Sequence, residues 1–384
     1  MRNLFLKRIL CTIMAIITLI PLCGSASAAE TDKEHTFCEI LIEASGGAVI
    51  ESVNEDVPVP VGTMAKLMTV LLAAEKVEAG ELSLDDKLKT SSHANSMQGA
   101  QIWLMPGEEI TVDELFKGII IGNANDASVV LAEKVSGSEE DFVKLMNQRA
   151  KELGMSNTVF TNCNGYYDNE KQVSTAADIA KLCAKLSEYD FLKRYFTCWR
   201  DFVRCKATEL VNANELVKSY KGIVGFKAGY TEDSGYCIAV GAERDGVTYI
   251  SVVLGCTDKE LNFTEAKRLM NSGFSGYTVF VPELPEDIPV EITVKGGMSA
   301  NVPVEYGEVR KVVLPNGAAG SLTSKVIVPD YVYAPVEKGS KVGEIHFIRN
   351  DKMIFTVDMF ASESAEKMTV LNAVSILLKK LLTF

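Results

Sequence analysis

Three short segments carry residue types that could together perform acyl transfer. Such chemistry needs a hydroxyl nucleophile, a lysine that accepts its proton, a second hydroxyl that relays this proton, and a cation that attracts a substrate carboxylate, and the segments supply these parts incompletely. Residues at i and i+3 share one face of a helix, so a hydroxyl at position 63 can meet an amine at position 66. The segments are Thr63-Met64-Ala65-Lys66, Asn123-Ala124-Asn125 and Lys227-Ala228-Gly229.

Each segment taken alone has an ordinary structural explanation. A single lysine on a helix, such as Lys66, is usually a solvated charge, and Asn125 beside Asp126 is typical of a turn or a helix cap. Lys227-Ala228-Gly229 is a common tripeptide. Only their joint placement in one cleft would indicate an active site.

Composition excludes several classes of function. The chain has 384 residues, a formal net charge of -12 and 47% hydrophobic residues, which is typical of a folded protein of about two domains. The negative charge, without any basic run, argues against nucleic-acid binding. The three histidines, His35, His93 and His346, lie far apart, so we expect neither a metal site nor a histidine-based triad, and no cofactor.

The first 28 residues are typical of a secretory signal peptide. Arg2, Lys7 and Arg8 precede an apolar stretch over residues 10–22, and a small-x-small site follows at residues 26–28. Cleavage there would start the mature chain at Ala29 and change its net charge to -12 - 3 = -15. Seven cysteines remain, an odd number scattered through apolar segments, which favours buried thiols over a disulfide scaffold.

The pattern of apolar residues predicts an α+β fold in which helices cover an antiparallel sheet. Residues 36–53 and 236–255 each indicate a β-hairpin, residues 63–80 have helical periodicity, and Thr111 and Ser138 are typical helix caps. We therefore predict one domain over residues 29–280 and a small all-β domain over 285–362. Residues 366–384 form an amphipathic helix that we expect to lie in a membrane interface; self-association or packing on its own domain is the alternative.

The three segments, in their order and surroundings, resemble those of the serine-type D-alanyl-D-alanine carboxypeptidases, the low-molecular-weight penicillin-binding proteins. That family carries Ser-x-x-Lys, Ser-x-Asn and Lys-Thr-Gly at these places. The resemblance extends over the stretches 61–75, 106–133, 137–155 and 225–240. It implies a β-lactamase/transpeptidase-like domain, a following β domain, and catalytic roles for Thr63, Lys66, Asn123 and Asn125. It also implies a substrate-binding role for Lys227, Ala228, Gly229 and Tyr230, with the oxyanion hole formed by the backbone N–H groups of Thr63 and Tyr230.

Each motif departs from the family pattern at one residue. Thr63 keeps a hydroxyl, but its extra methyl group stiffens and crowds the nucleophile. Asn123 replaces a hydroxyl that relays protons, and its neutral amide is a poor proton carrier. Ala228 lacks the hydroxyl that the family uses near the substrate carboxylate.

Two functional hypotheses follow from this comparison. The first is a carboxypeptidase of the cell envelope, at the outer face of the cytoplasmic membrane, that removes the terminal D-alanine from peptidoglycan stem peptides and reacts with β-lactams. The second is a catalytically inactive relative that binds stem peptides or wall enzymes as a scaffold. A β-lactamase-like hydrolase is a weaker third hypothesis, because the sequence indicates no carboxylate for deacylation.

Overall fold

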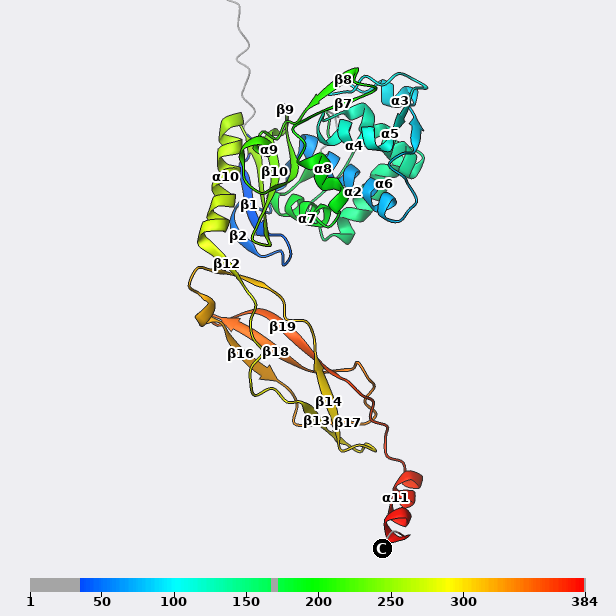
Figure 1. The fold of residues 1–384 in the computed structure, drawn as a ribbon, viewed down its shortest axis with the longest axis vertical. Coiled ribbons are helices and arrows are strands. Elements are labelled where there is room, and N and C mark those ends of the chain that lie inside the picture. The colour runs from blue at the N-terminus through cyan, green and yellow to red at the C-terminus, as the bar shows by residue number, and fades with distance from the viewer. Residues whose placement is uncertain (1–34, 167–171, 383–384) are drawn as a thin grey trace, which may run out of the picture. The chain divides into compact units, whose positions relative to one another are not determined.

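The computed structural model describes residues 35–166 and 172–382 (Figure 1). The predicted signal peptide, residues 1–28, lies outside the described residues. Within them, the predicted α+β fold class is confirmed: an antiparallel sheet with helices on its faces is followed by a β domain and a C-terminal helix.

The first domain is built on a five-stranded antiparallel sheet in the order β2-β1-β11-β10-β9. Both predicted hairpins are confirmed, since β1 pairs with β2 and β10 pairs with β11. The strands are β1 (Cys38–Glu43), β2 (Val49–Val53), β9 (Ile223–Thr231), β10 (Gly235–Arg244) and β11 (Val247–Cys256).

Alternating side chains give each face of this sheet its own apolar core. Ile40 of β1 and Ala239 of β10 belong to a cluster with the helices of the middle of the chain. Their sequence neighbours, Leu41 in β1 and Ile238 in β10, belong to a second cluster with Leu269. Successive strand residues point to opposite faces, so helices can cover both faces.

The helices between β2 and β9 cover the first face, except α9, whose Leu216 belongs to the second cluster (Figure 1). The predicted caps are confirmed: Thr111 and Glu114 form a capping box, and the Ser138 side chain accepts a hydrogen bond from the Asp141 amide. The helices are η1 (Gly62–Met64), α2 (Ala65–Glu78), α3 (Ser92–Asn95), α4 (Val112–Ile120), α5 (Asn125–Ser136), α6 (Glu139–Glu152), α7 (Ala176–Leu186), η2 (Asp190–Leu192), α8 (Lys193–Phe196) and α9 (Leu216–Ser219).

Helix α10 (Lys259–Gly276) covers the second face of the sheet through Ala266, Leu269 and Met270. Short antiparallel pairs complete this part of the chain. They are β3 (Val59–Pro60) with β6 (Val173–Ser174), β4 (Lys87–Lys89) with β5 (Glu109–Thr111), and β7 (Arg200–Val203) with β8 (Thr208–Val211).

The C-terminal part has a six-stranded sheet in the order β16-β18-β19-β14-β13-β17 with its own apolar cluster, which includes Ile345 and Val357. The strands are β12 (Tyr277–Phe280), β13 (Glu291–Lys295), β14 (Asn301–Tyr306), β15 (Val312–Pro315), β16 (Thr323–Ile327), β17 (Val332–Tyr333), β18 (Lys341–Arg349) and β19 (Lys352–Ala361); β12 pairs with β15, and η3 spans Ala319–Ser321. Helix α11 (Val370–Leu382) ends the described chain, in which we find no helix with the length and apolarity of a membrane span.

All seven described cysteines are free. Five of them are buried, Cys198 is half-buried and Cys205 is exposed, so the prediction of mostly buried thiols is confirmed for this part of the chain.

Candidate active site

Thr63 and Lys66 lie at the start of the helix that runs through the middle of the first domain. Thr63 is the central residue of η1, and Lys66 is the second residue of α2, which continues η1 directly. The helix turn places them on one side, as the spacing predicts. Ten successive residues of α2, Ala65 to Ala74, are buried, so the position of this turn is fixed by packing on every side.

The Lys66 side chain is 1% exposed. Its ammonium donates a hydrogen bond of 2.5 Å to the carbonyl oxygen of Asn164. Burial lowers the pKa of Lys66 to about 7, and the buried Asp126 carboxylate opposes this shift. A lysine with this pKa is partly neutral near neutral pH and can therefore accept a proton from a hydroxyl group.

Asn123 and Asn125 flank the start of α5. Asn123 has a left-handed backbone with φ of 58°, which asparagine adopts more readily than most residues, and its Nδ2 donates to the carbonyl oxygen of Ala228 at 3.3 Å. Asn125 is the first residue of α5, and its Nδ2 donates to the carbonyl oxygen of Gln98 at 2.6 Å. Asn125 is 2% exposed, so this side chain is held rigidly.

Lys227 projects from β9 into the same buried region. Its Nζ donates to the carbonyl oxygens of Ile119 at 2.6 Å and Ile120 at 3.4 Å, at the C-terminal end of α4. These carbonyls lack helical partners and carry the negative end of the helix dipole. Burial first, and the charge of Lys66 second, hold the pKa of Lys227 well below its usual range.

Gly229 lies directly against Thr63. A Cβ atom added at Gly229 would collide with the Thr63 hydroxyl and press on its methyl group. Gly165 has an equivalent relationship with Gly62, because a Cβ there would overlap the Gly62 carbonyl oxygen. Glycine at these two positions therefore lets β9 and the segment around Gly165 approach the nucleophile turn from two sides.

The structure places two of the predicted substrate-binding side chains away from Thr63. Ala228 is 3% exposed and belongs to the apolar cluster on the α10 face, with Ile238 and Val240, so only its backbone carbonyl contacts Asn123. Tyr230 is 53% exposed, and its ring lies 4.6 Å from the ring of Tyr236. The structure brings three pairs of predicted residues together: Thr63 with Gly229, Lys66 with Lys227, and Asn123 with the backbone of Ala228. The Asn125 side chain bonds instead to Gln98.

Sequence reasoning missed two residues that hold this site. Asn164 supplies the carbonyl that receives the Lys66 hydrogen bond, and the fully buried Asp126 accepts hydrogen bonds from the amides of Ile102 and Leu104, both at 3.1 Å. The backbone role of Asn164 leaves no pattern in the sequence. Asp126 is an acidic residue in the first turn of a helix, a common position that does not by itself indicate a buried role.

Three buried polar atoms at this site have no hydrogen-bond partner among the described residues: Thr63 Oγ1, Asn123 Oδ1 and Asn125 Oδ1. Buried polar groups in native proteins are nearly always paired, so a ligand or water that reaches these atoms would satisfy them. With Lys66 beside them, the arrangement supplies a hydroxyl, an amine that can accept its proton, and amide groups that can orient a peptide.

The sequence of residues 25–258 matches the family model described as D-alanyl-D-alanine carboxypeptidase. The chain belongs to this family. Residues 285–367 match a second model, the C-terminal domain of penicillin-binding protein 5.

Curated members of the D-alanyl-D-alanine carboxypeptidase family align along most of the chain. It is 33% identical to the D-alanyl-D-alanine carboxypeptidase DacF of Bacillus subtilis, over 94% of this chain and 95% of that protein. It is 31% identical to the D-alanyl-D-alanine carboxypeptidase DacC of Escherichia coli, over 85% and 84% of the two chains.

Solved structures have the same fold. Penicillin-binding protein 5 of Haemophilus influenzae superposes with a TM-score of 0.78 at 23% identity, over 86% of this chain and 97% of that one. Penicillin-binding protein D2 of Listeria monocytogenes, solved in its ampicillin-bound form, superposes with a TM-score of 0.57 at 29% identity, over 62% of this chain and 97% of that one.

Proposed function

We propose that this chain removes the terminal D-alanine from peptidoglycan stem peptides through an acyl-enzyme on Thr63, with slow turnover. One observation supports the proposal most directly. Thr63 Oγ1, Asn123 Oδ1 and Asn125 Oδ1 are buried and unpaired among the described residues, beside a lysine whose pKa is about 7. Leaving such atoms unpaired costs about 1–3 kcal/mol each, which a bound peptide would recover.

The proposed reaction has two steps. In the first, Thr63 Oγ1 attacks the carbonyl carbon of the penultimate D-alanine, its proton passes to neutral Lys66, and the C–N bond to the terminal D-alanine breaks as its amine takes up a proton. In the second, water attacks the ester on Thr63, the C–O bond breaks, and the threonine hydroxyl is restored. Backbone N–H groups of Thr63 and Tyr230 are the proposed donors to the oxyanion in both steps.

The recognition half of this site is proposed to be the better preserved one. Lys227 lies close enough to Lys66 for their charges to interact, and its protonated amine would pair with the terminal carboxylate of the substrate. Asn123 carries no hydroxyl, and Ser128, a further hydroxyl on α5, donates to the Ala124 carbonyl of its own helix at 2.9 Å. The proton must therefore pass directly from Thr63 to Lys66. The missing relay lowers the acylation rate by about 10²–10⁴-fold.

The same geometry also suits a protein that binds stem peptides without turning them over. The hydrogen bond from Asn123 Nδ2 to the Ala228 carbonyl favours this second candidate, because it fills the relay position with an amide that neither releases nor accepts a proton near neutral pH. The two candidates make opposite predictions for a covalent adduct.

Intact-protein mass spectrometry after incubation with excess penicillin distinguishes them. We expect a slow mass increase equal to one penicillin, absent in Thr63→Ala and faster in Thr63→Ser. Release of D-alanine from a pentapeptide substrate is then measured with the same three proteins. If the folded protein forms no adduct but binds the pentapeptide measurably, the enzyme hypothesis is rejected in favour of the binding protein.

We further propose that the protein acts at the outer face of the cytoplasmic membrane. Support comes from the predicted signal peptide at residues 1–28 and from α11, in which Val370 and Leu371 are 82% and 83% exposed. A helix with such an apolar face and lysines within it is typical of an interfacial anchor. β-Lactams, stem peptides and the membrane surface are the proposed partners, and no cofactor is needed for the two steps.

A further inference from the structure

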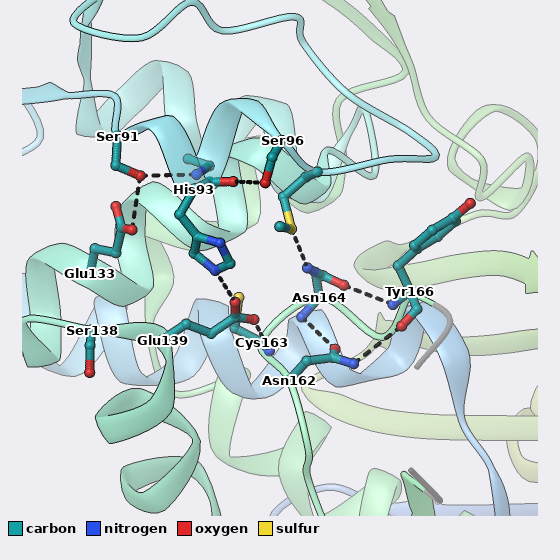
Figure 2. A network of polar contacts seen from close by, with 12 residues as sticks. Ser91, His93, Ser96, Glu133, Ser138, Glu139, Asn162, Cys163, Asn164 and Tyr166 are labelled. Atoms are coloured by element: carbon teal, nitrogen blue, oxygen red, sulfur yellow. Dashed lines mark hydrogen bonds and ion pairs between the residues drawn. The ribbon is translucent and has the colours of Figure 1, made fainter. Parts of the chain in front are cut away.

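The segment that receives the Lys66 hydrogen bond, residues 162–166, contains neither helix nor strand. Its own side chains shape it, as Figure 2 shows: Asn162 Oδ1 accepts hydrogen bonds from the amides of Asn164 at 3.1 Å and Gly165 at 2.6 Å. Asn164 Oδ1 in turn accepts one from the Tyr166 amide at 2.8 Å. These contacts fix the shape of the segment, and its position depends on contacts with the rest of the domain.

Cys163 provides two such contacts through its backbone. Its carbonyl oxygen accepts a hydrogen bond of 2.5 Å from the Thr69 hydroxyl of α2, the helix that also carries Lys66. Its amide donates to Glu139 Oε1 at 3.1 Å. The peptide unit on each side of Cys163 is therefore tied to a different helix, directly before the Asn164 carbonyl.

Glu139 is itself held in place from two directions (Figure 2). It is the first residue of α6, where a carboxylate interacts favourably with the helix dipole. Its second oxygen, Oε2, lies 2.7 Å from His93 Nε2. The Glu139 side chain is 16% exposed and that of His93 is 49% exposed, so the pair extends from the surface to the segment that holds the lysine.

We propose that Glu139 is a positioning residue for Lys66: by holding the Cys163 amide it fixes the Asn164 carbonyl and keeps the lysine covered. The inference deepens the proposed function, in which Lys66 accepts the Thr63 proton. Nothing in the three sequence motifs points to Glu139, which lies far from Lys66 in the sequence.

The charges around Lys66 show that Glu139 acts through geometry. Asp126 of α5 is the carboxylate that acts on the charge of the lysine, and the Cys163 thiol and Lys227 of β9 are the other titratable groups that face it. The charge of Glu139 acts instead on the Cys163 thiol, whose pKa burial and this carboxylate raise well above its ordinary value. Burial is the main cause of the lowered pKa of Lys66, so loosening the cover should let water reach the amine and raise that pKa.

The test measures the titration of Lys66 itself and does not require the protein to be catalytically active. The full protein is labelled with ¹³C at lysine Cε, and the Lys66 resonance is identified by its loss in Lys66→Met and followed by NMR across pH. Glu139→Asp keeps the charge but shortens the reach, whereas Glu139→Gln keeps the reach and removes the charge. Glu140→Ala is the matched control, since its neighbouring carboxylate is 83% exposed.

We expect the Lys66 titration midpoint to be near 7 in the parent, Glu139→Gln and Glu140→Ala proteins. It should move up by about one pH unit or more in Glu139→Asp and in Glu139→Ala. A Glu139→Asp midpoint equal to that of the parent, or a Glu139→Gln midpoint that rises with it, would overturn the proposal. If Glu139→Ala does not fold, the Lys66 midpoint of Glu139→Asp alone tests the proposal. If the Lys66 midpoints follow the expected pattern in all these proteins but no penicillin adduct forms, the proposed function is contradicted and this inference still holds.

Discussion

Asn123 and Ala228 are joined by a hydrogen bond of 3.3 Å from the asparagine Nδ2 to the alanine carbonyl oxygen. The contact ties the connection between α4 and α5 to strand β9, although the two residues are 105 positions apart in the sequence. Because the Ala228 side chain belongs to the apolar cluster on the α10 face, the bond depends on the Asn123 side chain and on the β9 backbone alone. Substitutions at position 123 therefore change both the proton path and a structural contact.

Asn123→Ser should increase the rate of penicillin acylation, by up to about 10²–10⁴-fold if the hydroxyl restores a proton relay. It should also lower the free energy of unfolding by about 1 kcal/mol, because φ at this position is 58° and serine tolerates that conformation less well than asparagine. Adduct formation is followed by mass spectrometry and stability by urea unfolding. Asn123→Ala is the control, and equal acylation rates for the serine and alanine variants would contradict the relay.

Gly229→Ala should slow acylation by about 100-fold, because the new methyl group displaces the Thr63 hydroxyl from its present position. The fold should survive with a loss of about 1–3 kcal/mol, as expected for one overpacked methyl group. The control is Gly276→Ala, where an added Cβ has no neighbour within 4 Å. Mass spectrometry at fixed times gives the rates, and unchanged kinetics in Gly229→Ala would show that the nucleophile lies elsewhere.

Acylation should become faster as the pH rises through about 7 and then level off. The pKa of Lys66 is lowered to about 7, so the amine is protonated and inactive below this pH and neutral above it. Initial rates of adduct formation are measured between about pH 5 and pH 9 in one mixed buffer. Lys66→Met should lose the activity at every pH. A rate that is independent of pH, or that falls through this range, would exclude Lys66 as the base.

Asp126→Ala should lower the free energy of unfolding by about 2–4 kcal/mol, because the amides of Ile102 and Leu104 would lose a buried charged acceptor. It should also lower the pKa of Lys66 further, since the Asp126 charge opposes the effect of burial. Asp190→Ala, at a side chain that is 88% exposed, should change stability by less than about 0.5 kcal/mol. Urea unfolding compares the two, and an equal small loss would contradict a structural role for Asp126.

Leu371→Glu should weaken the association of the mature chain with anionic phospholipid vesicles by about tenfold or more, because Leu371 lies on the apolar face of α11 and is 83% exposed. Asn372→Glu adds the same charge to the opposite face of the helix and should have a much smaller effect. Co-sedimentation with vesicles measures both. If the two variants bind equally, the apolar face of α11 does not contact the membrane.

Two hairpins, three helices of the first domain and the α+β fold class could be predicted from residue patterns. Runs of β-forming residues around a turn in 36–53 and 236–255 predicted the two hairpins, and the caps at Thr111 and Ser138 mark where helices begin. These patterns are local, because runs of β-forming residues, turn residues and helix caps each reflect the backbone conformation of a few neighbouring residues. The resemblance of three ordered segments to those of the carboxypeptidase family also predicted which residues lie near Thr63.

The contacts around those neighbours became clear only in the folded structure. The Lys66 hydrogen bond goes to a backbone carbonyl, which any residue type could supply, and the contact of Gly229 with Thr63 depends on how β9 packs against the nucleophile turn. The Ala228 side chain lies on the far face of β9 because strand residues alternate, and the sequence does not say which face holds the site. The burial that lowers the pKa of Lys66 likewise arises from segments brought together from distant parts of the chain, and folding alone assembles them.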